Sequence, residues 1–114
     1  MEYRANMKAL FIIVNTGYSD TVMEVARSAG ATGATILKAR GEGARHEVFM
    51  GMTVDSEKEI VLSLLDAETA EAVMVAIKEK AGRSTPAHSI CFTMPVSRIV
   101  GMTQENLYQE EVEK

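Results

Sequence analysis

Glycines and polar side chains that could bind an anion gather between residues 41 and 47. Gly41 and Gly43 flank one glutamate. Glycines let the backbone approach a ligand closely, and they expose N–H groups that can hold an anion. Their spacing does not match the Rossmann or Walker fingerprints, and glycines also end strands in ordinary turns. The pair therefore predicts either the base of an anion-binding loop or a strand-ending turn.

Arg45, His46 and Glu47 follow directly and could contact a carboxylate, bicarbonate or a metal ion. A metal site needs several converging ligands, and His46 is the only local histidine. We therefore favour a solvated loop segment here and predict no metal site.

No residue set in the sequence indicates an enzyme. Cys91 has no histidine beside it in sequence, and the loop serines lack a recognisable nucleophile elbow. We expect Cys91 to be buried in a strand, because free cysteines are among the most buried residues. A single cysteine cannot form an internal disulfide, which agrees with a reducing compartment and predicts the cytoplasm.

Length and charge narrow the class of protein. The 114 residues match one ordinary domain, so we expect residues 1–114 to form a single domain. The net charge of -4 and the scattered Lys and Arg disfavour binding to nucleic acid or to an anionic membrane. The apolar run at 9–14 is too short for membrane insertion.

Hydrophobic periodicity predicts four strands and two helices that could position these residues. Ser19 or Asp20 is the expected cap of the first helix, which ends at Gly30. Pro95 should bend or interrupt the last strand, because proline cannot donate to a sheet. In chain order we predict a strand at 8–15, a helix at 20–29, a strand at 33–40, an excursion at 41–56, a strand at 58–66, a helix at 67–82 and a strand at 89–102.

This β-α-β-β-α-β order predicts an α+β, ferredoxin-like sandwich: a four-stranded antiparallel sheet with two helices on one face. Apolar residues occupy both alternating faces of the first, third and fourth strands, so the bare face would expose a large hydrophobic patch. Association of the bare faces would cover it, and we expect a closed homo-oligomer.

The segments "GATGATILKARGEG", "EKEIVLSLLD" and "SICFTMPVSRIVGM", in this order, resemble the PII signal-transduction (nitrogen regulatory) family and its short-loop PII-like relatives. The resemblance covers a core at 8–102, followed by an acidic tail at 103–114. It implies a homotrimer that binds ATP or ADP between subunits. It also implies that a loop at 42–56 reports the ligand to a target such as a transporter or an enzyme.

The same resemblance implies the site residues. Thr35, Gly41 and Gly43 would lie at the loop base where nucleotide is contacted, and Leu64 would lie beside the adenine. The family's phosphate-gripping Gly-Asp-Gly-Lys corresponds here to Ala87, His88, Ser89 and Ile90.

Two further departures from the family remove positive charge, because the arginines that reach the phosphates correspond here to Gly101 and Thr103. Losing these cations disfavours ATP, while Arg98, Arg83 or Lys38 could supply a substitute for a nucleotide with fewer phosphates. We therefore expect a small anionic effector, an adenine nucleotide among ADP, AMP and ATP. His88 would gain a proton near an anion below pH 7, or it is simply an exposed loop histidine.

Two other functions keep the same fold. The chain could be an interaction module that has lost nucleotide binding. Less favoured is a metal-handling trimer similar to the CutA proteins, because the sequence lacks visible metal ligands.

Overall fold

The computed structural model describes residues 6–41, 47–49, 52–54 and 56–101. It confirms the predicted order of four strands and two helices, with one added hairpin. In chain order the elements are β1 (Met7–Asn15), α1 (Ser19–Ser28), β2 (Thr35–Gly41), β3 (Glu47–Phe49), β4 (Met52–Val54), β5 (Ser56–Asp66), α2 (Ala67–Ala81) and β6 (Ile90–Pro95).

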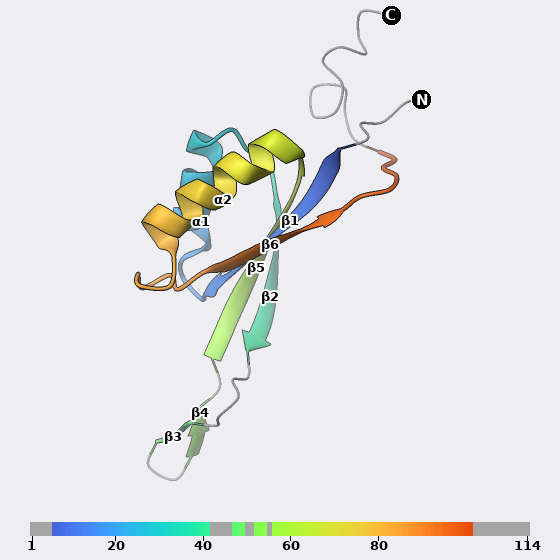
Figure 1. The fold of residues 1–114 in the computed structure, drawn as a ribbon. Helices are drawn as coiled ribbons and strands as arrows, with labels where there is room; N and C mark the ends of the chain where they lie inside the picture. The colour runs from blue at the N-terminus through green and yellow to red at the C-terminus, as the bar shows by residue number, and fades with distance from the viewer. Residues whose placement is uncertain (1–5, 42–46, 50–51, 55, 102–114) are drawn as a thin grey trace, which may run out of the picture.

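Four strands form one antiparallel sheet in the order β2-β5-β1-β6. Both helices lie on the same face of this sheet (Figure 1). The predicted ferredoxin-like sandwich is therefore confirmed. Within the 41–56 excursion, β3 and β4 pair only with each other.

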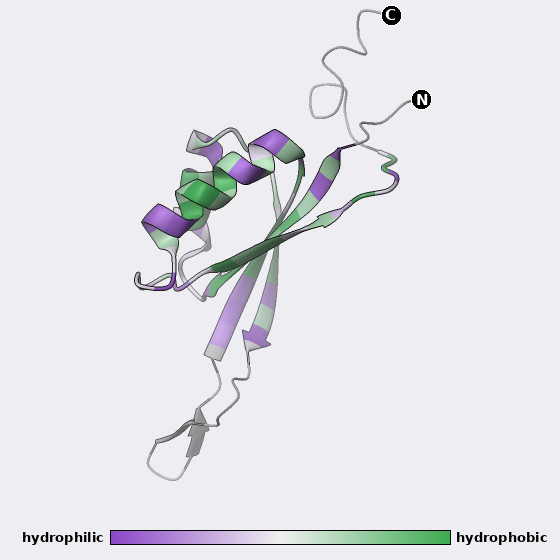
Figure 2. Cartoon of the chain, viewed as in Figure 1, coloured by the Kyte–Doolittle hydropathy of each residue, from purple (hydrophilic) through white to green (hydrophobic). Residues whose placement is uncertain are grey.

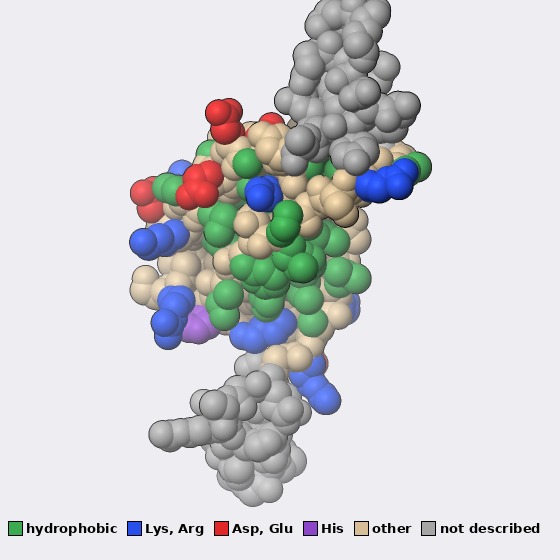
Figure 3. Space-filling model, turned by 45° about the vertical axis from the view of Figure 1, so that its right-hand side comes forward, with side chains coloured by type: hydrophobic (Ala, Val, Ile, Leu, Met, Phe, Trp, Pro, Cys, Tyr) green, Lys and Arg blue, Asp and Glu red, His purple; other side chains and the backbone are tan. Residues whose placement is uncertain are grey.

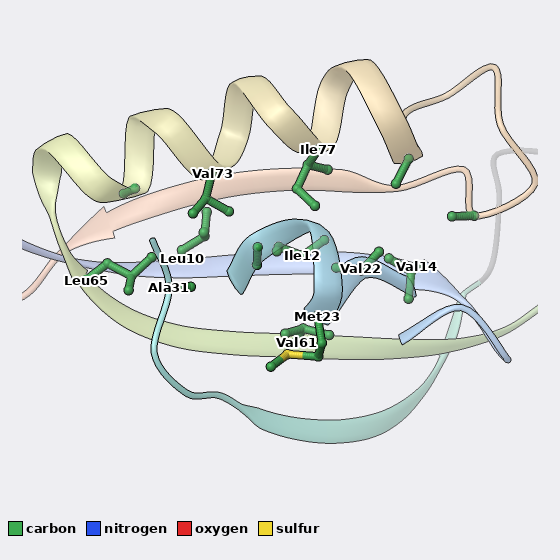
Figure 4. Packing of buried hydrophobic residues seen from close by; sticks show 14 residues of the cluster. Leu10, Ile12, Val14, Val22, Met23, Ala31, Val61, Leu65, Val73 and Ile77 are labelled. Carbon is green, nitrogen blue, oxygen red and sulfur yellow. The ribbon is translucent and has the colours of Figure 1, made fainter. Parts of the chain in front are cut away.

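The core lies between the two helices and the sheet (Figure 4). In both helices the buried residues recur at three- and four-residue spacing, as an amphipathic helix requires. From the sheet, alternate residues of β1 and β5 point toward the helices, because successive side chains of a strand face opposite sides. The largest fully buried side chains are Leu10, Ile12, Val14, Val22, Val61, Val73 and Ile77.

The opposite face of the sheet is also apolar, as predicted. Phe11 and Phe92 stack there with ring centroids 5.0 Å apart. Phe92 remains 41% exposed and Met94 50% exposed. Figure 3 shows hydrophobic side chains gathered into one patch, with Lys and Arg side chains at its borders.

Three predicted details are wrong. The last strand ends at Pro95 rather than at residue 102. Proline is tolerated there because β6 is an edge strand, and the Val96 N–H still donates to the Met7 carbonyl at 3.2 Å, in register with the preceding pairs. Cys91 is half-buried rather than buried, because β6 is an edge strand. Tyr18 occupies the cap position of α1 without a side-chain cap, so neither Ser19 nor Asp20 caps that helix.

Candidate functional site

A cavity of about 380 Å³ lies at the junction of β1, β2 and β5. The strand register aligns Thr35 with Leu62, and Leu62 with Phe11, so these three side chains share the sheet face that the helices leave bare. Leu64 lines the same cavity, so the fold brings Thr35 and Leu64 together. An apolar wall with a hydroxyl at its edge suits a flat, mainly apolar group.

A buried hydroxyl supports one side of this cavity. Ser63 is 4% exposed, and its hydroxyl donates to the Gly33 carbonyl at 2.9 Å. This bond attaches residues 32–34 to β5, so the backbone before β2 is held as a wall of the cavity.

A second group of predicted residues meets at the far end of the sheet, where Gly41 pairs with Ser56. Figure 2 shows β2 and β5 becoming hydrophilic toward this end. A Cβ at Gly41 would lie 3.1 Å from Cε of Lys58, so the glycine leaves room for this lysine side chain. A cation therefore packs directly beside the glycine at the loop base.

Asn15 connects that cation to the loop between α2 and β6. Its side-chain oxygen accepts from Lys58 Nζ at 2.7 Å, and its amide donates to the Pro86 carbonyl at 2.9 Å. Its backbone N–H donates to the Ala87 carbonyl at 3.0 Å. An ammonium carries three donors, more than Asn15 can use, so Lys58 is held in place with donors left for an anion.

Among Ala87, His88 and Ser89 of the predicted phosphate loop, only His88 is exposed. Ala87 is 2% exposed, and the buried Ser89 hydroxyl donates to the Ala81 carbonyl at the end of α2. His88 has a φ of 50°, and its Nδ1 lies 2.8 Å from the Arg83 carbonyl. A carbonyl only accepts, so Nδ1 carries the proton in this contact and Nε2 is the ring atom left for a ligand.

Two of the three predicted substitute cations, Lys38 and Arg98, lie apart from each other. Lys38 is exposed on β2, in register with Glu59, near the Gly41 end. Arg98 is exposed after β6. Its neighbour Ile99 packs with Met7, and Leu64 packs against that pair, which places Arg98 at the cavity end of the sheet. Gly43 lies outside the described residues.

The predicted site residues thus divide between two ends of one sheet. Thr35, Leu64 and Arg98 belong to the cavity end, whereas Lys38, Gly41 and His88 belong to the loop end. Thr35 and Gly41 are six residues apart on one strand, which corresponds to about 20 Å. One chain therefore does not bring the two groups together.

Asn15 and Lys58 are the residues that sequence reasoning missed. Asn15 ends an apolar run and Lys58 begins another, so each looked like an ordinary polar boundary of a strand. Their pairing follows from the β1–β5 register, in which the two residues are direct partners.

Within the described ranges, no three His, Cys, Asp or Glu side chains lie together as a metal site. Burial raises the pKa of the Cys91 thiol, which lowers its thiolate fraction. None of the helices in the described part of the chain is long and apolar enough to cross a membrane.

Comparisons with known proteins identify relatives of this chain. The family model described as nitrogen regulatory protein P-II matches residues 7–106. No curated protein sequence matches the chain. Among solved structures, a putative PII-like signalling protein from Thermus thermophilus has a TM-score of 0.60 at 21% identity, covering 79% of this chain and 85% of that one.

Two structures of Bacillus subtilis GlnK are also similar in fold. The GlnK–ATP complex has a TM-score of 0.64 at 14% identity and covers 84% of this chain and 86% of that one. The second GlnK structure has a TM-score of 0.60 at 15% identity and covers 80% of this chain and 85% of that one.

Proposed function

The chain belongs to the nitrogen regulatory protein P-II family, and from this premise we propose that it binds an adenine nucleotide between two protomers and signals to a target protein. The observation that carries the proposal is the division of the site residues between two ends of one sheet. A head-to-tail arrangement of protomers brings the cavity end of one chain to the loop end of the next. Such heterologous contacts close into a ring when the rotation allows it.

The cavity end suits the base of the nucleotide. Phe11, Leu62 and Leu64 provide apolar surface, and Thr35 provides a hydroxyl for a polar edge of the ring. A purine has this combination of a flat apolar face and hydrogen-bonding edges. That the similar GlnK structure was solved with ATP supports an adenine nucleotide as the ligand class.

The loop end suits the phosphates. Lys58 is fixed by Asn15 next to Gly41, with ammonium donors left for phosphate oxygens. Arg98 comes from the cavity end, so it would accompany the base from the neighbouring protomer. Together these residues offer fewer fixed cations than a triphosphate carries charges, which favours ADP or AMP over ATP.

The apolar face of the sheet supports a homotrimer. Its exposed side chains, including Phe92 and Met94, form a patch that association would remove from water. Ligand at Gly41 lies at the start of the 42–56 segment, and we infer that binding shifts the population of conformations in this segment. The target would be a transporter or an enzyme, and the cytoplasm remains the predicted compartment.

A nucleotide panel tests this function. Calorimetric titration and thermal unfolding with ADP, AMP and ATP should show binding, with stabilisation of about 2.7 kcal/mol at 100 times the dissociation constant. Thr35→Glu, which places a carboxylate in the base cavity, should abolish the response. Thr21→Glu adds the same charge at an exposed position of α1 and should leave the response unchanged.

The outcomes separate the three functions. Silence with every nucleotide contradicts the proposal and favours a nucleotide-independent interaction module. A response to divalent metals alone favours a metal-handling trimer. Equal nucleotide binding by Thr35→Glu and the wild type would show that the cavity is not part of the nucleotide site.

A further inference from the structure

A second groove lies outside the proposed nucleotide site, between α2 and β6. Its volume is about 410 Å³. From α2 its lining includes Glu71, Val75 and Lys78, which follow one another at four- and three-residue spacing along one helical face. Cys91 lines the groove from β6, and Met74 adds apolar surface. Val75 is 50% exposed, so hydrophobic surface is accessible in the middle of the groove.

The groove has a polarity along its length. Glu71 lies near the start of α2. Because α2 follows Asp66, and Asp66 pairs with Met7 at the cavity end, Glu71 is on the side of the groove toward that end. Lys78 and Arg83 lie toward the opposite end, where α2 leads into the loop. Moving away from the cavity end, a ligand would meet an acid, then apolar surface, then two cations.

The C-terminal residues from Leu107 on match the last two parts of this order. Leu107 and Tyr108 form an apolar pair, and Glu110, Glu111 and Glu113 follow. The described part of the chain ends at Gly101, on the segment that leaves β6 at the cavity end. A tail that runs back along β6 would therefore place its apolar pair first and its carboxylates last.

The chain length is sufficient for this path. Gly101 is ten residues after Cys91, so the two lie at most about 35 Å apart. Val112 is eleven residues after Gly101 and can extend about 38 Å. The tail can therefore return to Cys91 within the same chain.

We propose that residues 107–113 of the acidic tail dock into the α2–β6 groove of their own chain. The apolar pair covers Met74 and Val75, and the carboxylates face Lys78 and Arg83. Three observations support this occupant. The tail carboxylates complement the cations at the far end of the groove, the groove exposes apolar surface, and the chain is long enough to reach it. The inference does not depend on nucleotide binding.

Cys91 reports directly on this docking, because it lines the groove and is the only cysteine of the chain. Its labelling by N-ethylmaleimide, a neutral reagent, should be slow in the full chain. Truncation after Asn106 removes the apolar pair and most carboxylates, and labelling should accelerate about tenfold, which corresponds to about 1.4 kcal/mol of docking free energy. Raising the salt concentration should accelerate labelling of the full chain, because exposed charge pairs are screened.

A charge-reversal pair tests the same contact with the tail present. Lys78→Glu with Arg83→Glu should accelerate labelling as truncation does. The matched control, Arg27→Glu with Lys80→Glu, makes the same charge change at exposed helix positions that do not line the groove, and labelling should stay slow. Labelling that is unchanged by truncation, by salt and by the groove variant would overturn the proposal.

A disulfide trap identifies which chain supplies the tail. Val112→Cys with a mild oxidant should form a disulfide to Cys91 within one chain, visible as a faster monomer band on a non-reducing gel. A covalent dimer would contradict docking within the same chain. No disulfide together with fast labelling of the full chain would contradict docking altogether.

Discussion

At the scale of single residues, Asn15 connects the parts of the loop end. One side chain holds the Lys58 ammonium and the Pro86 carbonyl, while its backbone N–H holds the Ala87 carbonyl. The first bond constrains β5 and the other two constrain the loop before β6, so the position of the cation and the position of the loop are coupled. Lys58 is consequently better placed to bind an anion than an exposed lysine that moves freely.

Removing this cation should weaken nucleotide binding. A hydrogen bond to a charged group contributes about 1.5–3 kcal/mol, so Lys58→Gln should raise the dissociation constant for ADP by about 10- to 100-fold. Glutamine can still donate to Asn15, which keeps the loop in place. Lys80→Gln is the control, since Lys80 is exposed on α2 and should bind as the wild type does. Equal calorimetric constants for both variants would exclude Lys58 from the site.

Because of Cys91, the free energy of unfolding should depend on pH in the alkaline range. Burial raises its pKa above the ordinary value of 9.0, so the unfolded thiol ionises before the folded one. The contribution is complete below pH 9 and is lost as pH rises through the folded pKa. The free energy of unfolding should therefore fall more steeply above pH 9 in the wild type than in Cys91→Ala. Parallel pH profiles from urea denaturation would contradict a shifted thiol.

At the scale of elements, the two helices begin differently. Asp66 caps α2, and its carboxylate accepts from the Thr69 N–H at 2.7 Å, whereas α1 has no side-chain cap. Asp66→Ala should therefore cost about 1 kcal/mol of stability. Ser19→Ala should cost less than about 0.5 kcal/mol, as surface changes usually do. Urea denaturation of the two variants measures both values, and a larger loss in Ser19→Ala would contradict this assignment of caps.

The strands and helices were predictable from the pattern of their apolar residues, a continuous run for a buried strand and recurrence at three- and four-residue spacing for a helix. The run at 9–14 and the spacing of Ala70, Val73 and Ile77 are clear cases. The end of β6 was less predictable. A proline can bend a strand or end it, and the residue type alone does not decide between the two. Here the strand ends at Pro95, although the Val96 N–H still donates to the Met7 carbonyl in register.

The site was only partly predictable for a related reason. Thr35 and Leu64 share a cavity as the family resemblance implied, but the contact of Lys58 with Asn15 depends on the register between β1 and β5. Likewise, Ser89 looked available for a ligand in the sequence. The structure directs its hydroxyl to the end of α2, a contact between residues that only the folded loop brings together.

At the scale of the whole molecule, one sheet carries both halves of the proposed site at opposite ends. The cavity end has the apolar wall and Arg98, and the loop end has the glycine, Lys58 and His88. The bare face between them is hydrophobic, with Phe11 and Phe92 stacked on it. A monomer would leave this face in water and each half of the site without the other. A closed ring of protomers would bury the face and bring the two halves together.

Subunit complementation tests the shared site most directly. Thr35→Glu blocks the cavity end and Lys58→Glu blocks the loop end, so neither variant alone should bind ADP. After the two are mixed, unfolded and refolded at equal concentration, random assembly pairs two intact halves at about a quarter of the interfaces. Calorimetry of the refolded mixture should recover about a quarter of the wild-type sites. No recovery in well-folded mixed oligomers would show that both halves must come from one chain, and would contradict a site shared between protomers.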